Sequence, residues 1–163
     1  MPLEPPDQQH WQAALGYVEL GLFLEANEEL EKIDPYNRAA PEVLGVRVAI
    51  YHGLKKWDLL QVVAQRLAEF DVKNVDWVVS YAYATRRVES IEAAKTILLN
   101  VEQRFPNEPV IPYNLACYEA QLKNIEMAKR YLKRAFELNP DWRLQALEDE
   151  DLKPLWDSIQ VTI

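Results

Sequence analysis

The chain has 163 residues, of which 49% are apolar and 27% are charged, and its formal net charge is −8. This composition is too apolar for a disordered chain and fits one globular domain. The negative charge argues against nucleic acids and anionic membrane surfaces as partners, because both require a basic face on the protein.

Met1 to Gln9 is proline-rich and polar, and no apolar run of 18 residues follows it. We therefore expect neither a secretory leader nor a membrane-spanning helix. Cys117 is the single cysteine of the chain, so a disulfide framework and a zinc cluster are not expected. These features together predict a cytoplasmic protein.

The first expected helix pair covers residues 7–37. Tyr17 lies in its first helix, Ala26 opens its second helix, and Asp34-Pro35 ends it. The second helix of this pair is about one turn shorter than those of the later pairs.

The next two expected pairs cover residues 41–73 and 74–106. Pro41 stands where a helix begins, and Pro106 stands where one ends. Leu60 and Ala93 open the second helices of these pairs.

The fourth expected pair, residues 109–140, has the clearest pattern. Its two amphipathic helices are separated by a break near Lys123-Asn124, and Asn124 is a suitable N-cap for the second one. Asn139-Pro140 ends that helix. The apolar residues that recur at helical spacing are Leu115, Ala116, Leu122, Ala128, Leu132, Ala135 and Leu138.

Residues 141–163 are expected to form a cap of two short helices, near 141–147 and 151–160. Their apolar residues can cover the exposed face of the last repeat. The acidic run from Glu148 to Asp151 suits the start of the final helix. A divalent metal site is the alternative, but the run lacks the glycine turn and alternating ligands of a calcium loop.

These pairs recur with an almost constant period. The residues that open the second helices are Ala26, Leu60, Ala93 and Ala128, which are 34, 33 and 35 residues apart. Tyr17 and Tyr51 are also 34 residues apart. A helix–turn–helix unit of this length is typical of tetratricopeptide repeats.

The fourth pair, YNLACY followed by NIEMAKRYLKRAFELNP, resembles a tetratricopeptide repeat, and the resemblance extends over about residues 8–140. In the second repeat, Leu60 replaces the usual alanine and Arg47 replaces an apolar residue. The resemblance implies an all-α fold: a right-handed α-solenoid of four helix–turn–helix repeats with the C-terminal cap, forming a single domain over residues 1–163.

The resemblance also implies a concave groove lined by the first helix of each repeat. The groove residues that we expect to bind a peptide are Tyr113, Asn114, Cys117, Gln121, Arg86, Ala82 and His52. A clamp for a C-terminal carboxylate is disfavoured, because only Asn114 fits it and no lysine lies on this face. An apolar helix or extended segment is the expected ligand. The chain's own N-terminal tail, Met1 to Asp7, or a second copy could fill the groove instead.

No catalytic motif, phosphate-binding loop or metal-ligand pattern is found, and a nucleophilic Cys117 would need a base that His52 is too distant to provide. We therefore expect no enzymatic activity, no cofactor and no metal.

The predicted function is protein–protein interaction, as an adaptor or chaperone-like scaffold that binds a mainly apolar peptide or helix. In size, acidity and repeat number the chain is similar to the small tetratricopeptide chaperones of bacterial secretion systems. The alternative is a structural subunit that self-associates, for example as a homodimer, or assembles into a larger complex.

Overall fold

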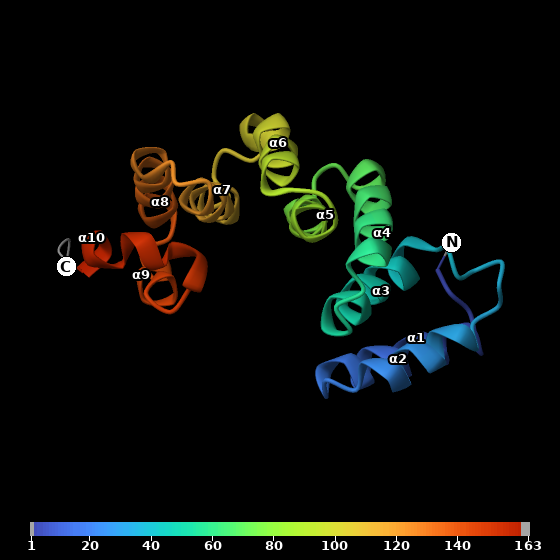
Figure 1. Cartoon of the computed structure of the whole chain (residues 1–163). Helices are drawn as coiled ribbons and strands as arrows, with labels where there is room; N and C mark the ends of the chain where they lie inside the picture. The colour runs from blue at the N-terminus through green and yellow to red at the C-terminus, as the bar shows by residue number, and fades with distance from the viewer. Residues whose placement is uncertain (1, 161–163) are drawn as a thin grey trace. The chain divides into compact units, whose positions relative to one another are not determined.

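The computed structural model describes residues 2–160 of the chain. Within this range the protein consists of ten α-helices and two short 3-10 segments, with no strand (Figure 1). The structure confirms the all-α prediction. Two compact units divide the chain, residues 1–84 and 85–163, and the boundary lies inside α5.

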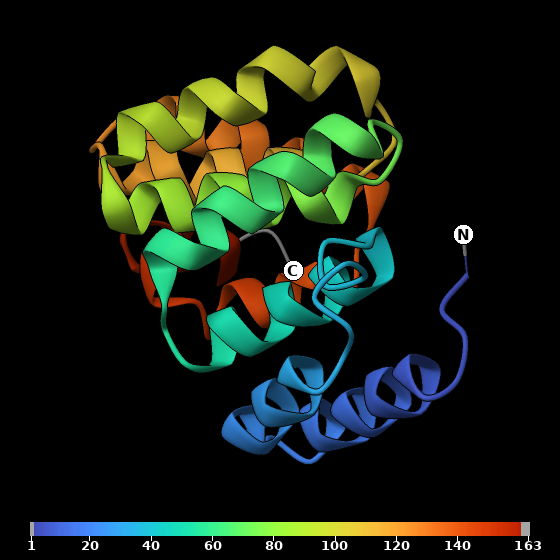
Figure 2. The same cartoon turned by 90° about the vertical axis from the view of Figure 1, so that its right-hand side faces the viewer.

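The first unit contains two complete helix pairs and most of α5. Its helices are α1 (Asp7–Glu19), α2 (Phe23–Glu31), α3 (Pro41–Gly53), α4 (Trp57–Phe70) and α5 (Val75–Val88). α1 and α2 lie side by side and are joined by a tight turn at Gly21, whose positive φ of 72° suits glycine (Figure 2). A buried cluster connects α1, α2 and α3, and Leu3 of the N-terminal tail packs against it.

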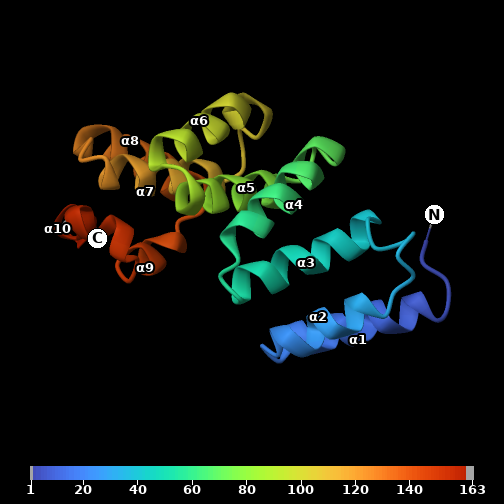
Figure 3. The same ribbon diagram turned by 45° about the vertical axis from the view of Figure 1, so that its right-hand side comes forward.

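The second unit begins within α5 and ends in the cap. It contains α6 (Ile91–Val101), the 3-10 segment η1 (Glu102–Arg104), α7 (Val110–Gln121) and α8 (Ile125–Leu138). The cap consists of α9 (Trp142–Ala146), the 3-10 segment η2 (Glu150–Leu155) and α10 (Trp156–Gln160), which Figure 3 shows following α8. The cap therefore has a 3-10 segment where the sequence predicts the start of a second α-helix.

The helix pairs repeat with a constant step of 34 residues. Their second helices begin at Phe23, Trp57, Ile91 and Ile125. The same step relates fully buried residues of these helices, which are Ala26, Leu60, Ala94 and Ala128. It also relates buried residues of the first helices, which are Ala14, Val48, Ala82 and Ala116. Each pair thus buries equivalent positions.

Ala94, and not Ala93, is the residue that aligns with Ala26 and Leu60, so the predicted register of the third pair is wrong by one residue. Ser90 is the N-cap of α6 and its Oγ accepts a hydrogen bond from the Ala93 N–H at 3.0 Å. This cap sets the start of the helix at Ile91, which turns Ala94 into the core and leaves Ala93 half-buried.

Arg47, which departs from the apolar residue of the repeat pattern, is buried with polar partners. Its guanidinium pairs with Glu31 at 2.7 Å and donates to Asn27 Oδ1 at 3.2 Å. The charge is therefore compensated within the first unit. The predicted limits of the four repeats each enclose one helix pair, while the assignment of residues 1–163 to a single domain stays a prediction.

Candidate interaction surfaces

Three of the predicted groove residues on α7 contact the cap. Tyr113 and Cys117 are buried, and the Tyr113 hydroxyl donates a hydrogen bond to Asp149 Oδ2 at 2.9 Å. Gln121 Nε2 donates to the Asp151 backbone carbonyl at 3.0 Å. The hydrogen bonds to this face therefore come from residues just before and within η2, and the Trp142 ring of α9 adds an edge-on contact to the Tyr113 ring at 5.2 Å between centroids.

Arg86 completes this site from the C-terminal end of α5. Its guanidinium binds the Asp151 carboxylate with both terminal nitrogens, and the Nη2–Oδ1 distance is 2.8 Å. The same guanidinium lies over the ring of Tyr118, 5.7 Å from its centroid. A bidentate contact of this kind fixes both the position and the orientation of the carboxylate.

The segment that carries Asp149 and Asp151 is held in this conformation by its own hydrogen bonds and by buried apolar side chains. Asp149 Oδ1 accepts from the Asp151 N–H at 3.0 Å, which caps η2. Leu152 and Leu155 follow and are buried. Polar anchoring by Asp149 and Asp151 thus combines with apolar burial to hold the cap on α7.

The other predicted groove residues have different surroundings. Asn114 Nδ2 donates to the Val110 carbonyl one turn earlier, at 2.8 Å. Ala82 is fully buried at the position equivalent to Ala116, so it offers no surface to a ligand. His52 is exposed in the first unit, where its ring contacts Trp57 and Tyr83 at centroid distances of 5.6 and 5.4 Å.

Burial and the nearby carboxylates of the cap shift the pKa values of three groove residues. Burial raises the pKa of the Tyr113 hydroxyl and of the Cys117 thiol, and the nearby Asp149 carboxylate raises both further. The hydrogen bonds to Asp151 raise the pKa of Arg86 against the opposing effect of burial. The thiol is therefore protonated at neutral pH and is a poor nucleophile.

Cys117, Asp149 and Asp151 are the one group of potential metal ligands found within the described residues, with ligand atoms within 4.8 Å of one another. They do not fit a metal ion well. Arg86 already neutralises Asp151, and the buried thiol would have to lose its proton to bind.

A pocket that sequence reasoning missed lies between α8 and the cap. We call it the terminal pocket; its volume is about 490 Å³. Its apolar lining comes mainly from Leu132, Phe136, Pro140, Leu155 and Ile159. All of these residues belong to the second unit.

Three cations line the terminal pocket as well: Lys129, Lys133 and Arg143, together with a single carboxylate, Glu137. The Arg143 guanidinium lies over the Phe136 ring, 5.4 Å from its centroid. The pocket therefore combines an apolar floor with a largely basic rim. The sequence signal that could have indicated this face is Lys129 and Lys133 at i, i+4 beside Leu132 and Phe136.

Across residues 2–160, no helix has the length and apolar character needed to cross a bilayer.

No protein-family model and no curated protein matches the chain. Solved structures do match its fold. A structure titled MamA MSR-1 C2 aligns with a TM-score of 0.71 and 21% identity, covering 83% of this chain and 78% of that one. A structure of a MamA mutant aligns with a TM-score of 0.65 and 22% identity, covering 80% and 76%. These likenesses agree with the helix pairs of the structure, and the chain folds as a set of tetratricopeptide-like helical repeats.

Proposed function

We propose that the protein is an interaction scaffold and that the terminal pocket is its principal docking surface for another protein. The observation that carries this proposal is an open apolar pocket of about 490 Å³ in the second unit. This volume lies within the range of about 300–1,000 Å³ that is typical of binding pockets.

The shape and charge of the pocket favour an amphipathic protein segment as the ligand. Leu132 and Phe136 are one turn apart on α8, so they present a continuous apolar strip along the helix. An apolar helix or turn can pack on such a strip. Lys129 and Lys133 beside it favour carboxylates at the edges of that segment.

In this proposal the groove residues of α5 and α7 have a supporting role. Tyr113, Gln121 and Arg86 anchor the segment that leads into Leu155, and Leu155 forms one wall of the terminal pocket. The scaffold role requires no catalytic residue and no cofactor.

The test is affinity capture from the native host, with the bound proteins identified by mass spectrometry. We expect one or more proteins captured by the wild type to be lost with Lys133→Glu. They should be retained with Lys73→Glu, which makes the same charge change at an exposed residue between α4 and α5. Identical capture by both variants would remove the terminal pocket as the docking surface.

A second candidate function is peptide binding at the predicted groove, as an adaptor or chaperone-like protein. The contacts of Asp149 and Asp151 favour this second function, because they show that Arg86 and Tyr113 can donate hydrogen bonds to two carboxylates of a peptide segment. A partner segment with two spaced carboxylates would displace residues 149–151. A synthetic peptide of residues 147–156, added to an Asp149→Ala/Asp151→Ala variant, should protect Cys117 from alkylation. No protection would exclude this groove as a peptide site.

A further inference from the structure

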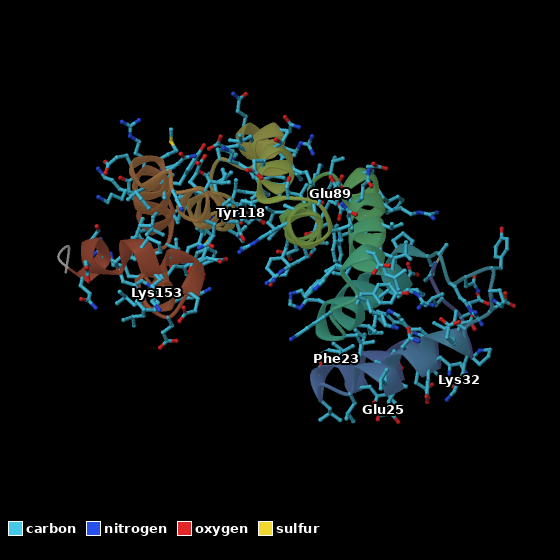
Figure 4. The ribbon with its side chains drawn as sticks, viewed as in Figure 1. Phe23, Glu25, Lys32, Glu89, Tyr118 and Lys153 are labelled. Carbon is cyan, nitrogen blue, oxygen red and sulfur yellow. The ribbon has the colours of Figure 1, made fainter. Side chains whose placement is uncertain are left out.

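The turn between α1 and α2 exposes apolar side chains that the first unit does not use. Leu20 and Leu24 are 73% and 63% exposed, and Leu22 is exposed between them. Phe23, by contrast, packs on α3, so closely that a Cβ on Gly53 would lie 2.3 Å from its ring. In Figure 4, Phe23 lies on the side of α2 toward α3, and Glu25 lies on the opposite side. The exposed leucines form what we call the N-terminal turn.

The N-terminal turn is surrounded by negative charge. Glu19, Glu25 and Glu28 are exposed beside it. No lysine or arginine occurs in the sequence before Lys32. An apolar surface with a purely acidic border is therefore presented by this end of the chain.

The terminal pocket has the complementary properties. The pocket is concave and apolar, whereas the N-terminal turn has protruding leucines. The pocket is lined by Lys129 and Lys133, whereas the turn carries glutamates. α8 as a whole carries four cations and two carboxylates, whereas α1 and α2 contain no lysine or arginine. Opposite charges of this kind select a partner and fix its orientation.

We infer that the occupant of the terminal pocket is the N-terminal turn of a second copy of this chain. This inference rests on the proposed function, since it names the partner of the same pocket. Each copy carries one turn and one pocket. If its turn and its pocket bind different neighbours, open chains or closed rings form, and if two copies exchange turns reciprocally, a two-fold dimer forms.

The contact consists of one short turn and one pocket, so it is smaller than a standard interface and the association is weak. Sedimentation velocity in a concentration series up to about 1 mM protein should detect the association, because contacts with millimolar dissociation constants become populated at that concentration. We expect the average mass to increase with concentration. Added salt should reduce it, because the charged groups at the rim are exposed to solvent.

Matched variants identify the two surfaces. Leu20→Ser/Leu24→Ser should weaken association by about tenfold or more, since these leucines are the apolar part of the contact. The control is Leu59→Ser/Val62→Ser, which removes exposed apolar groups from α4 and should change little. Lys133→Glu should weaken association as the turn variant does, and Lys73→Glu should not. Circular dichroism checks that all four remain folded.

Mixing provides the decisive measurement. A turn variant retains an intact pocket, and a pocket variant retains an intact turn, so a mixture of the two should form a one-to-one heterodimer that does not grow further. Two results would overturn the inference: a wild type that remains monomeric at about 1 mM, or a Lys133→Glu variant that associates as well as wild type. In either case, capture of a foreign protein that depends on Lys133 would leave the proposed docking function standing.

Discussion

Leu60 and Leu59 are neighbouring leucines on α4 with opposite surroundings, and they allow a direct test of the repeat register. Leu60 is completely buried, at the position equivalent to Ala26 and Ala128, whereas Leu59 is 42% exposed. The same substitution, leucine to alanine, can therefore be made at both residues. If the 34-residue register is right, only the change at Leu60 should create a cavity.

The expected magnitudes differ clearly. Buried Leu→Ala changes cost about 2–5 kcal/mol, and the larger values occur where the site cannot collapse. Leu60 belongs to a cluster whose other buried members include Ala64 and Ala84, which are too short to fill a cavity. We therefore expect a loss of about 3–4 kcal/mol for Leu60→Ala. For Leu59→Ala we expect about 1 kcal/mol or less, because much of that side chain is already in water.

Urea unfolding followed by ellipticity at 222 nm and by tryptophan fluorescence measures both variants. For a chain of this size, 1 kcal/mol corresponds to about 2–4 °C in Tm, so thermal melts should separate the variants by several degrees. Equal losses for the two variants, or a larger loss at Leu59, would refute the assignment of Leu60 to the buried helix-crossing position.

Three further predictions concern other parts of the chain. Gly53→Ala should destabilise the first unit by about 1–3 kcal/mol, because the new Cβ would overlap the Phe23 ring. Gly16→Ala should stabilise α1 by about 0.5–1 kcal/mol, because a Cβ at this residue would meet no neighbouring atom within 4 Å. The urea unfolding midpoints of the two variants measure both effects. Hydrogen bonds from the Asn37 side chain and the Asp34 N–H lower the pKa of Asp7 below its usual 3.8, so its stabilising effect is present above about pH 4 and is lost as the pH falls through the lowered pKa. The stability difference between wild type and Asp7→Asn should accordingly shrink below about pH 4, and a difference that is constant from pH 7 to pH 2 would contradict this reasoning. Arg86→Ala should release the cap and increase alkylation of Cys117 by about tenfold, as measured by mass spectrometry, whereas Arg130→Ala on the exposed face of α8 should not.

The helix pairs were predictable from the sequence because each one repeats the same burial requirements. Apolar residues at helical spacing, with prolines and asparagines at the helix ends, indicate the pairs without any tertiary information. The one-residue error at Ala93 arose because two alanines are adjacent there and both satisfy the pattern. Ser90 resolves the ambiguity, since an N-cap fixes the first turn of α6.

Helical spacing also predicted that Tyr113, Cys117 and Gln121 share one face of α7. It could not predict what covers that face. The contacts join residues that are 30 to 65 positions apart, as in Gln121 with Asp151 and Arg86 with Asp151. The acidic run was assigned to the cap, but its charges were interpreted as signals for the start of a helix, with a divalent metal site as the alternative. Its specific partners depend on the tertiary packing of the cap against α7.

The terminal pocket was missed because a gap between packed elements is not encoded by any single residue type. Lys129 alone indicates only a solvated helix face, and it becomes part of the pocket lining because Leu155 and Ile159 of the cap stand opposite α8. The segment that covers Tyr113 is continuous with the one that supplies Leu155, so the groove and the terminal pocket depend on the same docked cap. A ligand that displaced residues 149–151 from α7 would also disturb a wall of the terminal pocket. Binding at the two surfaces should therefore be antagonistic, because each ligand favours a different position of the cap.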